Sequence, residues 1–84
     1  MKFELYLTAR AKGDFASLSG STLERITRAL EKISMNPYIG KFLKGELQGL
    51  HSYRTGNYRI IYEVVKAKIV IIVLKIGHRK DVYR

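Results

Sequence analysis

The chain has 84 residues, of which 16 are Lys or Arg and 7 are Asp or Glu, so its formal charge is +9. A chain of this length fits one small domain with a single core, and we take residues 1–84 as that domain. The absence of Cys excludes a disulfide framework and a thiolate metal site. The positive charge favours a polyanionic partner, either nucleic acid or an acidic protein.

Two stretches of the sequence bear on its location. Residues 1–10, MKFELYLTAR, contain no apolar signal core. The most apolar stretch, residues 66–77, is interrupted by Lys and is far shorter than the roughly 20 apolar residues that a membrane span needs. The sequence therefore predicts a cytoplasmic protein that does not cross a membrane.

The first half of the sequence predicts a strand followed by two helices. Residues 2–8, KFELYLT, alternate apolar and polar side chains as a strand does, and residues 9–20 predict a short helix. The clearest helix is predicted for residues 21–37, STLERITRALEKISMNP, because apolar side chains recur every three or four residues. Ser21 and Glu24 have the spacing of a capping box at its start.

The second half predicts three strands, at residues 50–55, 58–65 and 68–76. Gly56 and Asn57 separate the first two strands and form a two-residue hairpin signal. The predicted order is β-α-α-β-β-β. This order indicates an α+β fold in which an N-terminal helical hairpin packs on one face of an antiparallel sheet.

The hairpin register places Arg54 directly opposite Arg59. Like charges in direct cross-strand opposition are unfavourable, whereas an anion between two guanidinium groups would stabilise the pair. Two alternatives stay open: both side chains extend into solvent, or a different register separates them.

Other residues suited to RNA phosphodiester chemistry surround this pair in the sequence. Arg binds phosphate, Tyr stacks on unpaired bases, and His exchanges protons near neutral pH. These candidates are Lys41, Lys44, His51, Ser52, Tyr53, His78, Arg79, Lys80 and Tyr83. Neither a Gly-rich phosphate loop nor a metal-ligand spacing of His and carboxylates is present, so we predict no metal site.

Residues 43–64, LKGELQGLHSYRTGNYRIIYEV, and residues 76–83, IGHRKDVY, resemble the RelE/ParE toxin superfamily of bacterial and archaeal toxin–antitoxin systems. The similarity spans nearly the whole chain and implies a compact sheet with two N-terminal helices. It also implies a toxin that a cognate antitoxin holds inactive in a hetero-oligomer. RelE-like members cleave mRNA in the ribosomal A site, whereas ParE-like members inhibit DNA gyrase and lack the ribonuclease residues.

The arginines and the terminal tyrosine match the RelE-like pattern. Arg59 corresponds to the family Arg that assists at the scissile phosphate, and Arg54 matches a further Arg on the strand. Arg79 corresponds to the Arg that follows Gly-Lys in the family, and Tyr83 corresponds to its near-terminal Tyr. These matches favour the RelE-like branch.

The sequence departs from this pattern at the positions of proton transfer. The family carries Lys twice on the strand before the hairpin, and Leu50 and Ser52 stand at those positions here. Lys41 stands where YoeB-like relatives carry a catalytic carboxylate. His78, with an ordinary pKa of about 6.5, or a nearby Lys offers a replacement.

The resemblance therefore predicts the toxin of a type II toxin–antitoxin system, acting as a metal-independent endoribonuclease on ribosome-bound mRNA. The ribose 2′-hydroxyl would attack the adjacent phosphate, which requires no cofactor. The expected catalytic residues are Arg59, Arg79, Tyr83 and His78, and the expected RNA- or ribosome-binding residues are Arg54, Lys41, Lys44 and Lys80. The expected partners are an acidic cognate antitoxin, the ribosome and mRNA.

Two alternatives belong to other functional classes. One is a ParE-like, non-enzymatic inhibitor of DNA gyrase. The other is a degenerate toxin that acts only as the partner and co-repressor of its antitoxin.

Overall fold

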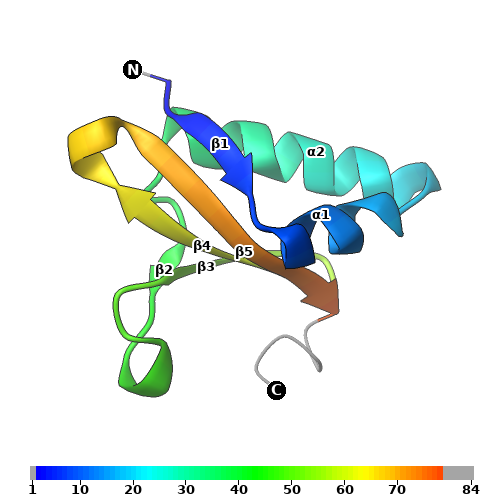
Figure 1. Cartoon of the computed structure of the whole chain (residues 1–84). Coiled ribbons are helices and arrows are strands. Elements are labelled where there is room, and N and C mark those ends of the chain that lie inside the picture. Colours follow the sequence, from blue (N-terminus) through cyan, green and yellow to red (C-terminus); the bar gives the residue numbers. More distant parts are fainter. Residues whose placement is uncertain (1, 79–84) are drawn as a thin grey trace.

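A computed structural model of the chain describes residues 2–78 (Figure 1). Its helices and strands are, in order, β1 (Glu4–Leu7), α1 (Ala9–Ala16), α2 (Gly20–Met35), β2 (Lys41–Phe42), β3 (His51–Thr55), β4 (Tyr58–Val65) and β5 (Val70–His78). Two short 3₁₀ helices, η1 (Gly45–Leu47) and η2 (Lys66–Lys68), precede β3 and β5. Neither α-helix has the length and apolar character needed to cross a membrane.

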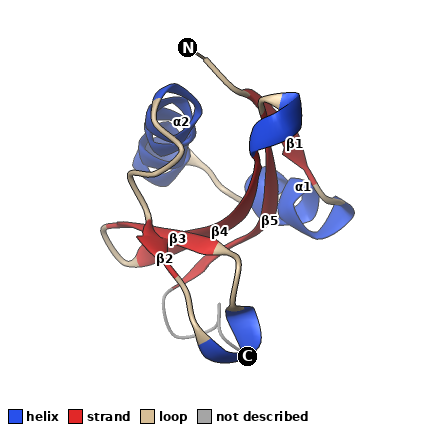
Figure 2. Cartoon of the chain, turned by 90° about the vertical axis from the view of Figure 1, so that its left-hand side faces the viewer, coloured by secondary structure: helices blue, strands red, loops and turns tan. Residues whose placement is uncertain are grey.

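The strands form one five-stranded sheet in the order β1-β5-β4-β3-β2. The predicted α+β class and element order are confirmed, with two differences in the sheet. Strand β1 pairs in parallel with β5, so the sheet is mixed, while the other three pairings are antiparallel. Strand β2 is a two-residue edge strand that was not predicted from the sequence. Figure 2 shows η1, between β2 and β3, projecting away from α2.

The predicted two-residue hairpin is confirmed in loop length and register. Thr55 lies opposite Tyr58, and Arg54 lies opposite Arg59. Of the two turn residues only Gly56 has a positive φ, of 60°. A two-residue turn with Gly first in this conformation matches the right-handed twist of the strands.

The start of α2 differs from its prediction. The helix begins at Gly20 after the N-cap Ser19, whose side chain makes no capping hydrogen bond. Ser21 therefore lies inside the helix, and the predicted capping box with Glu24 is wrong. Helix α1 is also shorter than predicted, because the chain leaves the helix at Ser17.

Both helices contribute to one core against the sheet. Ala11 of α1 and the predicted apolar stripe of α2 pack against β4 and β5 in a single buried cluster that includes Ile26, Leu30, Ile33, Ile60, Tyr62, Ile71, Val73 and Ile76. Burial of each large apolar side chain contributes about 1.5–3 kcal/mol. This cluster fixes which face of the sheet is internal, and we call the opposite face the outer face.

A β-bulge in β5 decides which of its last side chains reach the outer face. Tyr62 lies opposite Val73 and the preceding Ile61 lies opposite Lys75, so Leu74 is the extra residue. In an unbroken strand Lys75 would point to the same side as Val73, into the core. The bulge turns Lys75 to the outer face and directs Ile76 into the core, where Ile76 is 3% exposed.

Candidate functional site

The hairpin end of the outer face carries two rows of side chains across the sheet. The first row runs from Arg54 on β3 to Arg59 on β4 and Gly77 on β5. The second row lies two residues farther from the hairpin turn. It consists of Ser52, Ile61 and Lys75, with Lys41 of β2 beside Ser52. Cross-strand neighbours lie about 4.5–5.5 Å apart between Cβ atoms, and the two rows about 7 Å apart. Four cations, from four different strands, therefore gather on one small surface.

Arg59 occupies the centre of this surface. Its Nη1 donates a hydrogen bond to Ser52 Oγ over 3.3 Å, which directs the half-buried guanidinium over the second row. Arg54 is exposed, and its Nε lies 3.5 Å from the carbonyl oxygen of Gly56. The predicted juxtaposition of the two arginines is thus observed. Their two positive charges, held directly opposite each other on neighbouring strands, create a strong local preference for an anion.

Of the predicted lysines, Lys41 and Lys44 lie in different parts of the structure. Lys41 lies on edge strand β2, opposite Ser52, and is exposed on the outer face. Lys44 is exposed in the loop just before η1, beyond the end of β2. Arg79, Lys80 and Tyr83 lie outside the described residues.

His78 and Arg59 lie on opposite faces of the sheet. His78 is the cross-strand partner of Tyr58, and the two rings contact edge to face with centroids 5.9 Å apart. The bulge at Leu74 is the cause, because without it the alternation of β5 would bring His78 to the outer face. The structure therefore does not bring together His78 and the arginines that the sequence assigned to one site.

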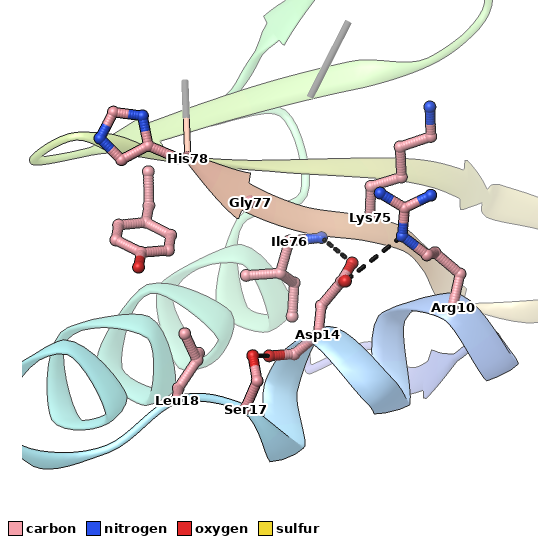
Figure 3. A pocket seen from close by; sticks show the side chains of 9 residues that line it. Arg10, Asp14, Ser17, Leu18, Lys75, Ile76, Gly77 and His78 are labelled. Atoms are coloured by element: carbon pink, nitrogen blue, oxygen red, sulfur yellow. Dashed lines mark hydrogen bonds and ion pairs between the residues drawn. The ribbon is translucent and has the colours of Figure 1, made fainter. Parts of the chain in front are cut away.

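Figure 3 shows the pocket of about 290 Å³ beside His78, between α1 and the end of β5. Strand β1 pairs with β5 only as far as Val73, and Asp14 of α1 covers part of the remaining edge. Its Oδ2 accepts a hydrogen bond from the Ile76 N–H over 3.0 Å, and its Oδ1 accepts one from Arg10 Nε over 3.3 Å. Asp14 thus holds the strand that carries Lys75.

Lys75 is the site residue that sequence reasoning missed. Figure 3 shows the Lys75 and Ile76 side chains leaving β5 in opposite directions, although both residues line the pocket. The sequence contained a signal for it, since a Lys interrupts the otherwise apolar run of residues 69–76. Alternation alone places that Lys on the wrong face, because the bulge cannot be read from the residue types.

Tyr62 anchors the loop that leads to Lys41. Its hydroxyl donates a hydrogen bond to the Pro37 carbonyl oxygen over 2.8 Å and accepts one from the Gly40 N–H over 3.1 Å. A Cβ on Gly40 would collide with this hydroxyl, so the close approach requires glycine. Burial raises the pKa of Tyr62 above its usual value, and the hydrogen bond from Gly40 opposes that shift.

His51 packs against Tyr62 and does not lie on the outer face. Its ring stacks on Tyr62 with centroids 5.3 Å apart and meets the edges of Phe42 and Tyr38 at 5.2 and 6.0 Å. The side chain is 8% exposed, and its Nδ1 is buried without a hydrogen-bond partner. Burial lowers the pKa of His51 below its usual value because the imidazolium loses hydration.

Within residues 2–78, no group of three or more His, Asp or Glu side chains is arranged to hold a metal ion. The arrangement on the outer face can instead bind a phosphate through guanidinium and ammonium groups.

Fold and site together define a small α+β protein with concentrated positive charge on one sheet face. The family model described as the ParE toxin of type II toxin–antitoxin system, parDE, matches residues 5–83. Toxin RelG of Mycobacterium tuberculosis is 31% identical over 86 residues, covering 100% of this chain and 99% of RelG.

Solved structures agree with these matches. A chain of the RelBE2 toxin–antitoxin complex from Mycobacterium tuberculosis has a TM-score of 0.85 and 28% identity, over 94% of this chain and 100% of that one. The isolated E. coli RelE toxin has a TM-score of 0.79 and 25% identity, over 96% of this chain and 90% of that one. The chain belongs to the RelE/ParE superfamily and is a type II toxin.

Proposed function

We propose that this toxin is a metal-independent endoribonuclease that cleaves ribosome-bound mRNA. The observation that carries the proposal is the juxtaposition of Arg54 and Arg59 on the outer face, with Lys41 and Lys75 in the adjoining row. A surface of this charge and spacing suits a backbone phosphate with its flanking nucleotides. The RelE and RelG names of the similar toxins favour the same branch of the superfamily.

The reaction needs only groups of the RNA and the protein. The ribose 2′-oxygen forms a bond to the adjacent phosphorus, the bond from phosphorus to the 5′-oxygen breaks, and the products are a 2′,3′-cyclic phosphate and a 5′-hydroxyl. Arg59 stabilises the charge that develops on the non-bridging oxygens, an effect worth about 10²–10³ in rate for one donor in other enzymes. Arg79 and Tyr83 are assigned to the same site from the family resemblance, as a second charge donor and as a stacking or proton-transfer group. This assignment does not rely on His78.

The same proposal includes an acidic antitoxin as the partner of this chain. Several large apolar side chains are more than a third exposed: Tyr6, Met35, Tyr38, Ile39, Phe42 and Ile69. A groove of about 550 Å³ lies between β1 and α2, beside the open outer edge of the sheet. An acidic segment that adds a strand at β1 and packs a helix on apolar surface would cover both features and offset the charge of +9. The similar RelBE2 structure is itself a toxin–antitoxin complex.

Inhibition of DNA gyrase is the second candidate, favoured by the match to the ParE family model. Two assays with the purified chain separate the candidates. In the first, ribosomes programmed with a defined mRNA are mixed with the toxin, and primer extension detects cuts. In the second, gyrase supercoils relaxed plasmid in its presence. We expect mRNA cuts and unimpaired supercoiling; blocked supercoiling with intact mRNA would overturn the endoribonuclease assignment.

A further inference from the structure

The β-bulge at Leu74 delivers one cation to a position that the resemblance does not assign. Lys75 is half-buried on β5, a strand held between β1 and β4. Bulges commonly re-aim a side chain beside a functional site. Here the bulge keeps the long amine out of the core and places it on the same face as Arg59.

Lys75 and Arg59 lie close together on the outer face, in adjoining rows of neighbouring strands. Gly77, which follows Lys75 on the same face, lies directly opposite Arg59 and presents no side chain. Ile61, opposite Lys75, is 2% exposed, so its neighbours on the outer face cover it. Because Gly77 places no side chain beside Arg59, the Arg59 guanidinium and the Lys75 ammonium can reach the same oxyanion, since the Lys75 alkyl chain extends across roughly one row.

Lys75 is also better held than Lys41. Lys41 is exposed on a two-residue edge strand, whereas β5 pairs on both sides through Val73 and is fastened beyond it by the hydrogen bond from Ile76 N–H to Asp14. Proton transfer requires a donor positioned within hydrogen-bond reach of the reacting oxygen. A cation whose backbone lies on a fixed central strand is better suited to that role than one on a short edge strand.

We propose that Lys75 is the general acid of the cleavage reaction. This inference rests on the proposed endoribonuclease function. The Lys75 ammonium donates a proton to the departing 5′-oxygen as the bond from phosphorus to that oxygen breaks. The 2′-hydroxyl proton leaves to solvent, and the neutral amine regains a proton from water, so atoms and charge balance over one turnover. Arg59 holds the non-bridging oxygens during the same step.

The test compares Lys75→Met, Lys75→Arg and the wild type in single-turnover cleavage on programmed ribosomes. The matched control is Lys68→Met, which removes a lysine from the exposed turn η2. One mRNA carries the natural 5′-oxygen at the cut site, and a second carries sulfur there, because a thiolate departs without protonation. Thermal melts of each variant report whether the fold is retained.

We expect Lys75→Met to cut the oxygen mRNA at least about 10²-fold more slowly than wild type and the sulfur mRNA at nearly the wild-type rate. Lys75→Arg, whose guanidinium is too weak an acid, should stay slow on oxygen while being as fast as wild type on sulfur. Lys68→Met should match wild type on both. Wild-type rates for Lys75→Met on the oxygen mRNA, or equal slowing on both mRNAs, would overturn the assignment. A wild-type toxin that leaves both mRNAs intact would instead refute the underlying endoribonuclease function.

Discussion

The opposed pair Arg54 and Arg59 should be repulsive in the free toxin, and this repulsion can be measured. Direct cross-strand opposition of like charges costs about 0.2–1 kcal/mol. Arg59→Ala relieves that repulsion but removes the hydrogen bond to Ser52 Oγ, a contact worth about 0.5–1.5 kcal/mol. Arg54→Ala relieves the same repulsion and loses only a 3.5 Å contact with the turn. We therefore expect Arg54→Ala to be neutral or stabilising and Arg59→Ala to change stability by no more than about 1 kcal/mol.

A double-mutant cycle isolates the interaction of the two guanidinium groups. Free energies of unfolding would be measured with urea, which adds no ions, in dilute chloride buffer. We expect a coupling of about 0.2–1 kcal/mol in the repulsive sense, such that Arg59→Ala is more destabilising when Arg54 is already absent. Lys68→Ala is the control for loss of one positive charge from a chain of charge +9.

Inorganic phosphate provides the second arm of this experiment. A ligand that binds only the folded state raises stability by RT ln(1 + [L]/Kd). Phosphate should therefore stabilise the wild type more than chloride of equal ionic strength does, and should stabilise Arg59→Ala and the double variant no more than chloride does. An attractive or absent coupling in chloride, or equal effects of phosphate and chloride on the wild type, would refute the anion-site reasoning.

Two further predictions concern the anchor beneath Lys41. Tyr62→Phe keeps the ring but removes the hydroxyl that bonds Pro37 and Gly40, so thermal melts should show a loss of about 1–3 kcal/mol in the free energy of unfolding. The control Tyr6→Phe, at an exposed tyrosine, should change stability by less than about 0.5 kcal/mol. Equal melting of the two variants would contradict the role of the Tyr62 hydroxyl. Because burial lowers the folded-state pKa of His51, the unfolded chain binds a proton more readily, so His51 stabilises the fold above its ordinary pKa of about 6.5 and loses that contribution as pH falls. His51→Phe should flatten the decline in stability between pH 7.5 and 5 seen in urea titrations, and an unchanged slope would show that other groups cause it.

Short-range features of this chain could be read from its sequence. The Gly56-Asn57 hairpin, with Arg54 opposite Arg59, follows from turn chemistry and alternation. The stripe through Ile26, Leu30 and Ile33 follows from helical periodicity. In both cases residues close together in the chain determine the geometry.

Features that depend on distant segments were not predictable in the same way. The parallel pairing of β1 with β5 joins residues more than sixty positions apart, and nothing local specifies its direction. The bulge at Leu74 reverses the faces of Lys75 and His78, and its position depends on how Tyr62, Val73 and Ile76 fit the core. The sequence thus favoured His78 as the proton-transfer group, whereas the observed register puts Lys75 beside Arg59.

The chemical identity of the cut ends tests the central claim most directly. A defined mRNA on programmed ribosomes would be treated with wild-type toxin or Arg59→Ala, and the ends of the fragments identified by mass spectrometry. Attack by the 2′-hydroxyl predicts a 2′,3′-cyclic phosphate and a 5′-hydroxyl with the wild type, and a rate at least about 10²-fold lower with Arg59→Ala. Intact mRNA, fragments with a 3′-hydroxyl and a 5′-phosphate, or wild-type cleavage by Arg59→Ala would contradict it.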